Sequence, residues 1–145
     1  MRGTYCLLAE LPEGCSIRVG KLGTFDFPAG AYVYVGSALG GIQQRVKRHK
    51  STNKRRRWHV DYFLSKARIV STISIPCGSK EYECAVAQTL MRAEGAVVVA
   101  EGFGSSDCGC DTHLIYFGDG GIEPVAETVS MRLSMLTCVH PRTMR

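Results

Sequence analysis

No stretch of this 145-residue chain is apolar for long enough to cross a lipid bilayer. A membrane-spanning helix needs about 20 consecutive apolar residues, whereas Glu10 and Pro12 interrupt the most apolar early segment. That segment also lacks the long apolar core and the small-residue cleavage site of a secretory signal peptide. We therefore expect a cytoplasmic protein that has no membrane partner.

The sequence shows no internal repeat and none of the compositional bias of disordered or fibrous proteins. Hydrophobic residues make up 45% of the chain, charged residues 21% and aromatic residues 8%. These proportions are typical of a folded globular domain. A length of 145 residues suits one domain with a buried core and is short for two.

The seven cysteines do not form the even set that a disulfide framework requires. Their odd number and scattered positions favour mostly reduced thiols, as a cytoplasmic compartment would maintain them. Cys6 and Cys84 lie in apolar patterns. We therefore expect both of these side chains to belong to the core.

Acidic residues are absent between Asp26 and Asp61, and basic residues gather in the second half of that interval. The basic side chains between positions 45 and 57 are Arg45, Lys47, Arg48, Lys50, Lys54, Arg55, Arg56 and Arg57. Such a stripe attracts polyanions by Coulomb steering and counterion release, and nucleic acid is the commonest partner of this kind. The alternative is a solvated loop that only keeps the protein soluble.

Hydrophobic periodicity and turn residues divide the chain into short strands and helices. Strands are expected at residues 4–10, 16–19, 24–27, 31–36, 69–75, 96–100 and 113–117. Helices are expected at residues 41–50, 58–66, 80–92 and 124–138. This mixture predicts an α/β domain in which helices flank a central sheet.

Two tripeptides carry the first chemical signal. Gly-Thr-Tyr at residues 3–5 lies on the first expected strand, and Tyr-Val-Gly at residues 34–36 ends a later strand. A hairpin separates them, and the helix that follows carries Arg45. This arrangement resembles the GIY-YIG nuclease superfamily, which implies a mostly antiparallel central sheet with both tripeptides on neighbouring strands and the arginine in the same site.

The resemblance implies catalytic roles for Tyr5, Tyr34 and Arg45. A phenol with a reference pKa near 10 can orient a water molecule or act as a base when neighbouring charges lower that pKa. A permanently protonated guanidinium binds the scissile phosphate and its developing negative charge. The alternative for both tyrosines is an ordinary place in the core, because aromatic residues in strands are usually packed there.

Two histidines extend this expected site. His49 follows Arg45 by four residues, so the two lie on one face of a helix, and family members place a histidine or tyrosine there beside the attacking water. His59 occupies a position where some family members carry a second active-site histidine. The alternatives are a surface residue for His49 and a helix start at His59, with Asp61 as a favourable charge in the first turn.

The resemblance also implies a glutamate that holds Mg²⁺ or Mn²⁺ against the phosphate. In the expected helix at residues 80–92 that role falls to Glu83, unless the register is later and the position is held by Gln88, a weak neutral ligand. The alternative for Glu83 is an exposed charge in the first turn.

The loop at residues 103–114 contains Cys108, Cys110 and His113. With Ser-Ala at 37–38 and Trp-His-x-Asp-Tyr at 58–62, this loop resembles an uncharacterised archaeal and bacterial branch of GIY-YIG-like proteins, some fused to DNA glycosylases of the endonuclease III kind. The likeness covers about Met1 to Phe117. We therefore expect a GIY-YIG-like domain at residues 1–118 and a C-terminal extension of a helix plus a tail at residues 119–145.

The three residues of this loop could also supply soft ligands to Zn²⁺. A complete zinc site needs a fourth ligand, which the sequence does not identify, so any zinc bound there is expected to be weak or substoichiometric. A structural loop with a hydrogen-bonded histidine and a reactive thiol are the alternatives.

These features together predict a metal-dependent endonuclease that hydrolyses DNA phosphodiester bonds, with DNA repair as its setting. The residues expected to contact the nucleic acid, DNA or RNA, are Lys47, Arg48, Lys54, Arg55, Arg56 and Arg57. The alternative is a module that binds nucleic acid through the same basic stripe but does not cut it, because its metal site has decayed.

Overall fold

The computed structural model describes residues 2–38, 40–52, 54–77, 79–106 and 108–136. Within these residues the strands are β1 (Gly3–Leu11), β2 (Cys15–Val19), β3 (Gly23–Phe27), β4 (Gly30–Ala38), β5 (Arg68–Ile75), β6 (Val97–Val98) and β7 (Leu114–Tyr116). The helices are α1 (Ile42–Lys50), α2 (His59–Leu64), α3 (Lys80–Met91) and α4 (Ile122–Ser134). Each expected element is present within a few residues of its expected bounds.

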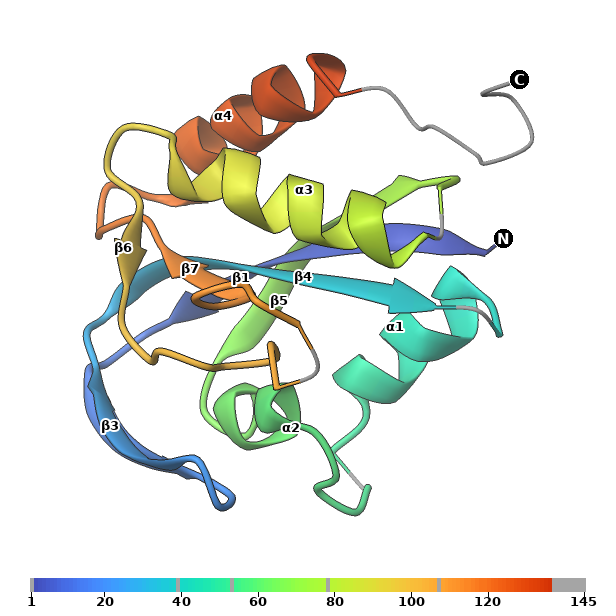
Figure 1. Ribbon diagram of the computed structural model, residues 1–145. Coiled ribbons are helices and arrows are strands. Elements are labelled where there is room, and N and C mark those ends of the chain that lie inside the picture. Colours follow the sequence, from blue (N-terminus) through green and yellow to red (C-terminus); the bar gives the residue numbers. More distant parts are fainter. Residues whose placement is uncertain (1, 39, 53, 78, 107, 137–145) are drawn as a thin grey trace.

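Five of the strands form one sheet in the order β5-β1-β4-β7-β6, and every neighbouring pair in it is antiparallel. In Figure 1, α3 and α4 cover one face of this sheet, while α1, α2 and the β2-β3 hairpin lie on the other. The structure confirms the predicted α/β class and the antiparallel central sheet flanked by helices.

The two faces of the sheet bury different apolar clusters. Cys6, Leu8, Val33 and Val35 pack against α3 and α4 on one side. On the other side, Phe27, Tyr32 and Phe63 belong to a cluster that includes the hairpin and α2. β1 is buried along almost its whole length because it lies between two other strands and beneath helices on both sides. Burying one large apolar side chain contributes about 1.5–3 kcal/mol, so these two layers hold the sheet rigidly.

The pairing register between β1 and β4 places the two motif tyrosines together. Tyr5 lies opposite Gly36, and Leu7 lies opposite Tyr34. Side chains two residues apart point to the same face of a strand, so Tyr5 and Tyr34 are diagonal neighbours on one face. Their ring centroids are 6.5 Å apart.

The C-terminal helix α4 begins and ends earlier than the expected helix at residues 124–138. Val125 and Val129 are buried in the same cluster as α3, and α4 contacts both α3 and β1. Residues 137–145, which include Cys138 at the end of the expected helix and the tail expected after it, lie outside the described residues. The division of the chain at residue 118 stays a prediction. None of the helices in the described ranges is both long and apolar enough to span a membrane.

Candidate active site

A cavity of about 340 Å³ opens at the end of the sheet where β4 extends past β7. Its lining includes the motif residues of β1 and β4 and side chains from three further segments: Tyr5, Tyr34, Arg45, Trp58, His59 and Glu83. Of the predicted catalytic and magnesium-binding residues, five therefore meet in one cavity. His49 lies directly behind it, where its ring contacts Tyr5 and Tyr34.

The absence of a side chain at Gly36 is what allows the Tyr5 hydroxyl to lie here. A Cβ atom at this position would stand 2.6 Å from the Tyr5 hydroxyl oxygen and 2.7 Å from the ring carbon that bears it. Real Cβ atoms do not approach other atoms so closely. The glycine of the second tripeptide and the tyrosine of the first are thus matched across the β1-β4 ladder.

The Tyr5 hydroxyl forms a hydrogen bond of 2.7 Å with His49 Nε2. Burial raises the pKa of Tyr5 and opposes ionisation, while the Arg45 guanidinium partly offsets this by favouring the phenolate. Burial, aided by the charge of Lys54, lowers the pKa of His49 to about 4. At neutral pH the pair therefore consists of a protonated phenol and a neutral imidazole, which can accept a proton.

Stability should depend on pH through His49, which is only 3% exposed and whose Nδ1 has no hydrogen-bond partner in the described part of the chain. Its folded pKa of about 4 lies below the unfolded value of 6.5, so the unfolded state gains the proton first as the pH falls. The contribution of neutral His49 to the free energy of unfolding is complete above pH 6.5 and is lost progressively toward pH 4. By linkage, unfolding at pH 5 should cost about 2 kcal/mol less than at pH 7.

Urea unfolding of the wild type and of His49→Gln at both pH values measures this effect. The difference between the two proteins isolates the histidine from the other titrating groups. Equal changes in both proteins would show that His49 titrates alike in the folded and unfolded chains.

Arg45 lies on the side of α1 that faces the cavity. Its Nη1 donates a hydrogen bond of 3.2 Å to the carbonyl oxygen of Ser37, and its guanidinium carbon lies 4.5 Å from the centre of the Trp58 ring. These two contacts hold a permanent positive charge at the cavity wall and leave other N–H groups able to bind an anion.

Glu83 contributes a carboxylate to the cavity, and it is only 5% exposed. Its Oε1 accepts a hydrogen bond of 2.6 Å from the Ser37 hydroxyl, and its Oε2 lies 2.9 Å from His113 Nδ1 and 3.6 Å from Lys80 Nζ. Burial would raise the pKa of Glu83, but the hydrogen bonds from His113 and Ser37 outweigh it and lower that pKa. Glu83 is therefore a buried anion that faces the cavity.

The structure decides between the two registers that the sequence left open for α3. Ser79 caps the helix through a hydrogen bond from the Tyr82 N–H, and this start turns Glu83 toward β4. Gln88 is exposed, and its amide nitrogen lies 3.8 Å from Cys110 Sγ. Gln88 is thus directed toward the cysteine loop.

His59 opens α2 and lines the cavity from the side opposite α3. Its Nδ1 accepts a hydrogen bond of 2.8 Å from the Gly104 N–H, and burial lowers the pKa of His59. Asp61, in the same helical turn, is fully buried and binds the Arg48 guanidinium through both oxygens at 2.9 and 3.1 Å. It also accepts from the backbone N–H of Trp58, so it anchors the helix start.

The basic stripe comprises the end of α1 and the loop at residues 51–57, which we call the basic loop. Some of its basic side chains are held by internal partners, and others are exposed. Besides binding Asp61, Arg48 lies 4.1 Å from the centre of the Trp58 ring. Lys54 Nζ donates to the carbonyl oxygens of Arg48 and His49 and so closes the end of α1. The exposed basic side chains are Lys47, Lys50, Arg55, Arg56 and Arg57. Fewer basic side chains are therefore available to contact nucleic acid than the sequence suggested, because Arg48 and Lys54 are held by internal partners.

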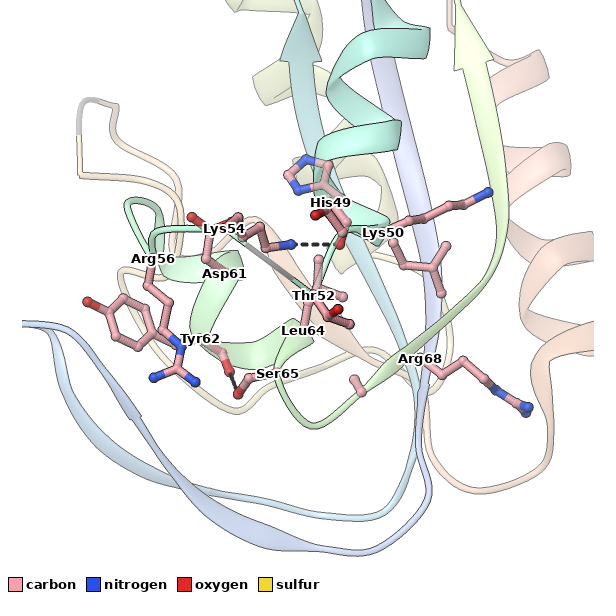
Figure 2. A pocket seen from close by; sticks show the side chains of 13 residues that line it. His49, Lys50, Thr52, Lys54, Arg56, Asp61, Tyr62, Leu64, Ser65 and Arg68 are labelled. Carbon is pink, nitrogen blue, oxygen red and sulfur yellow. Dashed lines mark hydrogen bonds between the residues drawn. The ribbon is translucent and has the colours of Figure 1, made fainter.

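A second, larger cavity of about 870 Å³ lies behind this loop (Figure 2). Lys50, Lys54, Arg56 and Arg68 contribute to its lining. Arg57 belongs instead to the wall of the first cavity. Basic side chains of this loop thus line both cavities.

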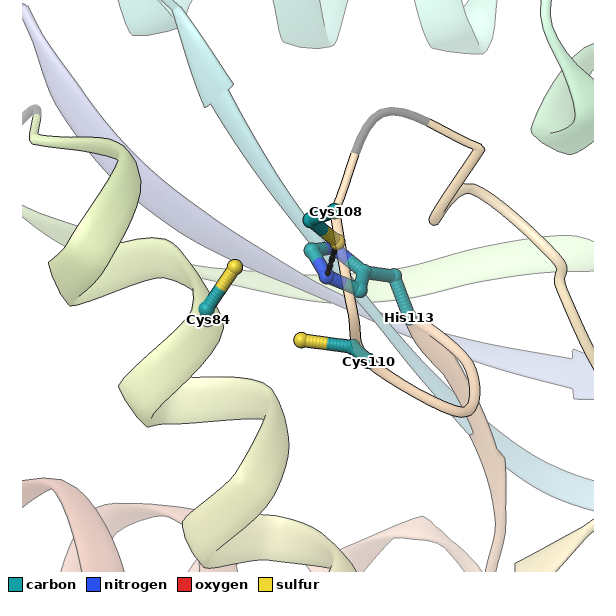
Figure 3. Close-up of side chains that lie close together, drawn as sticks. All are labelled: Cys84, Cys108, Cys110 and His113. Carbon is teal, nitrogen blue, oxygen red and sulfur yellow. Dashed lines mark hydrogen bonds between the residues drawn. The ribbon is translucent and has the colours of Figure 1, made fainter.

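Four soft ligands meet beside α3, on the other side of Glu83 from the tyrosines. The sulfur atoms of Cys84, Cys108 and Cys110 and a ring nitrogen of His113 lie within 4.8 Å of one another (Figure 3). This group could hold a metal ion. Two expectations were wrong here: Cys84 is half-buried and belongs to this cluster rather than to the core, and the missing fourth ligand is present. Cys6 is fully buried, as expected.

The cluster was missed because Cys84 follows Glu83 on α3 and is 24 residues from Cys108 along the chain. Only the packing of α3 against the cysteine loop brings the two together. The sequence offers one local signal, which is that Cys84 lies at the border of the buried face of the helix. Val86 and Leu90 belong to that face, whereas Glu81 on the other side of Cys84 is exposed.

Comparison with known proteins identifies a family to which the chain is similar. The model of a family described as a domain of unknown function, DUF123, matches residues 4–134. Neither the curated proteins nor the solved structures contain a match.

Proposed function

The chain belongs to the DUF123 family, and we propose that it is a metal-dependent endonuclease of the GIY-YIG type that hydrolyses phosphodiester bonds in DNA. The single observation that carries this proposal is the convergence of Tyr5, Tyr34, Arg45 and Glu83 on one cavity. Arg57 lines that cavity, and with the exposed Arg55 and Arg56 that precede it in the chain it supplies a surface for the phosphate backbone.

The donor set fits a hard divalent cation such as Mg²⁺ or Mn²⁺. Mg²⁺ is usually bound by one or two carboxylates, with water and substrate phosphates completing its shell. Glu83 offers an ionised carboxylate whose oxygens retain lone pairs beyond their present hydrogen bonds. When bound, the cation supplies Lewis acidity that stabilises charge on the phosphate and on the leaving oxygen.

Arg45 is the group that binds the scissile phosphate. Its guanidinium keeps its charge at any working pH. It is already held in place by Ser37 and Trp58, so little reorganisation is needed as negative charge develops. Tyr34 lines the same cavity and, fully protonated because burial raises its pKa, can donate a hydrogen bond to a phosphate oxygen.

Tyr5 and His49 provide a route for the proton of the attacking water. The water transfers its proton to the Tyr5 oxygen while the Tyr5 hydroxyl proton passes to His49 Nε2, 2.7 Å away. The resulting hydroxide attacks phosphorus, the bond to the leaving oxygen breaks, and that oxygen takes a proton from solvent. His49 then releases its proton to solvent, which restores the neutral pair. A bound phosphate places negative charge beside the pair and favours the protonated imidazole. His59, at the rim, assists by orienting the water.

Incubation of the purified protein with end-labelled nicked, flapped and intact DNA tests this proposal. We expect strand scission in the presence of Mg²⁺ or Mn²⁺ and no scission in EDTA. RNA of the same sequence is the comparison substrate, and preferential cutting of RNA would reassign the substrate. A protein that binds these DNAs but cuts none of them with any divalent cation would favour the non-catalytic binding module.

DNA binding should weaken steeply as the salt concentration rises. Each bound phosphate adds roughly 0.9 to the slope of log K against log salt. Replacing Arg55, Arg56 and Arg57 together by alanine should therefore lower the slope by roughly one unit for each phosphate that the variant no longer binds. Anisotropy titrations over a range of salt concentrations give both slopes.

A control that removes two positive charges instead of three replaces Arg92 at the end of α3 and Arg132 on α4, which lie on the other face of the sheet. This control should reduce the affinity slightly through net charge and leave the slope nearly unchanged. Equal slopes for the wild type and the loop variant would exclude the basic loop as the contact surface.

A further inference from the structure

We propose that Cys84, Cys108, Cys110 and His113 form a tetrahedral Zn²⁺ site with a structural role. This inference is independent of the proposed nuclease activity and concerns different side chains. It replaces the expectation of weak zinc binding, which rested on the lack of a fourth ligand.

The distances suit zinc. With bonds of about 2.3 Å to sulfur and 2.0 Å to nitrogen, the corners of a tetrahedral zinc site lie roughly 3.5–3.8 Å apart. Cys108 Sγ and His113 Nε2 are 3.5 Å apart, and all four donor atoms lie within 4.8 Å of one another. In Figure 3 the three sulfur atoms and the imidazole point toward a common centre from α3 and from the loop before β7. Only small side-chain movements are needed to bring the four donor atoms to the spacing of a tetrahedral zinc site.

The hydrogen bonds of His113 prepare it as a ligand. Its Nδ1 faces two oxygen acceptors, the carboxylate of Glu83 at 2.9 Å and the carbonyl of Val35 at 3.2 Å. Nδ1 therefore carries the proton, and in the neutral ring Nε2 presents its lone pair to the sulfur atoms. Ligating histidines in metalloproteins almost always donate their second N–H to a carboxylate or a carbonyl in this way. An amide N–H from Gln88 approaches Cys110 Sγ at 3.8 Å and can stabilise a thiolate.

The ligand set identifies both the metal and its role. Thiolate and imidazole donors in a tetrahedral arrangement favour Zn²⁺ over the hard cations expected at Glu83. Four protein ligands leave no open position for substrate, which is the mark of a structural site. The site joins α3 to the segment between Phe103 and His113, which contains no strand or helix among its described residues and is otherwise held by isolated backbone hydrogen bonds such as Cys108 N to Ser105 O.

The position of the site also has a consequence for the cavity. Glu83 precedes the ligand Cys84 on α3, and its Oε2 is bound to the ligand His113. Bound zinc would therefore hold the Glu83 carboxylate in place in two ways, through the neighbouring Cys84 on α3 and through the contact with His113. Cys84 and His113 act as positioning residues for Glu83 in the proposed nuclease, and this consequence alone rests on that function.

The test uses the full chain, expressed with zinc and purified under reducing conditions without chelator. We expect elemental analysis to find one zinc per chain. Replacement of the zinc by Co²⁺ should produce the intense visible bands of tetrahedral cobalt and the near-ultraviolet charge-transfer band of thiolate ligands. Cys84→Ser and Cys108→Ser should each lose most of the zinc, whereas Cys15→Ser, which removes a free thiol on β2 outside the cluster, should retain it.

Two further measurements keep the test decisive if a serine variant does not fold. Cys84→His preserves four nitrogen or sulfur ligands, so it should retain zinc but show a weaker thiolate charge-transfer band with Co²⁺. Removal of zinc from the wild type by a chelator should lower its melting temperature, and added Zn²⁺ should restore it. Metal-free wild type, zinc retention in both serine variants, or peptide mapping that finds a disulfide between two of the three thiols would each overturn the proposal. The mass of the whole chain does not decide this, because Cys77 is disulfide-bonded in the structure. None of these measurements involves DNA, so they stand whether or not the protein cuts it.

Discussion

Arg45→Ala should reduce DNA cleavage by about 10²–10³-fold, because a preorganised donor aimed at developing negative charge contributes this much to catalysis. The guanidinium is held by Ser37 and Trp58 at the wall of the cavity, and no other arginine of α1 lines it in the described structure. Single-turnover cleavage at saturating protein separates this loss from weaker binding. Arg45→Lys keeps the charge but not the planar fork, so it should recover only part of the rate.

Gln44→Ala is the matched control, because Gln44 is the exposed neighbour on the same helix. It should leave both cleavage and stability unchanged. Cleavage by Arg45→Ala at the wild-type rate would remove the guanidinium from the mechanism.

Gly36→Ala should lower the cleavage rate by about 10²-fold or more and destabilise the fold. The added methyl group would stand 2.6 Å from the Tyr5 hydroxyl oxygen and 3.1 Å from a ring carbon of Tyr34, so both motif tyrosines must move. Forcing a methyl group into a packed site costs about 1–3 kcal/mol, and a displacement of about 1 Å in a catalytic group can cost 10²-fold in rate. Urea unfolding and the single-turnover assay measure the two effects.

Gly40→Ala provides the comparison, since a Cβ atom at Gly40 meets nothing within 4 Å. That variant should cleave DNA like the wild type. A fully active Gly36→Ala protein would mean that the close approach of Tyr5 to Gly36 has no part in catalysis.

Local sequence patterns predicted the scaffold because each element has its own signal. Apolar patterns predicted the strands at residues 4–10 and 31–36, and the family resemblance of the two tripeptides implied that these strands are neighbours. Strand pairing then brings Tyr5 near Tyr34. The four-residue spacing of Arg45 and His49 likewise placed both on one face of α1. At the edges of the sheet the signal is weaker, since β6 forms only at Val97–Val98 within the expected strand at residues 96–100.

The finer features of the site depend on packing that a sequence does not reveal. Glu83 and Gln88 lie about 1.4 helical turns apart, and only the packing of α3 against β4 places Glu83 in the cavity. In the sequence, Arg48 and Lys54 cannot be distinguished from the exposed arginines beside them, because all of them belong to one cluster of basic residues. Their buried partners, Asp61 and the carbonyl groups at the end of α1, become apparent only when the loop folds back. The place of Cys84 in the metal-binding cluster is also hidden in the sequence, because it depends on the packing of α3 against the cysteine loop.

The most direct test of the central claim is the single-turnover cleavage rate of wild type, Glu83→Gln and Gln88→Glu on one flapped DNA as Mg²⁺ is titrated. The wild type should cut with saturable dependence on Mg²⁺, Glu83→Gln should lose about 10²-fold or more because charge stabilisation worth several kcal/mol is removed, and Gln88→Glu should match the wild type. Cleavage by Glu83→Gln at the wild-type rate, or a wild type that is inert while Gln88→Glu cuts, would contradict the assignment of Glu83 as the metal-binding carboxylate.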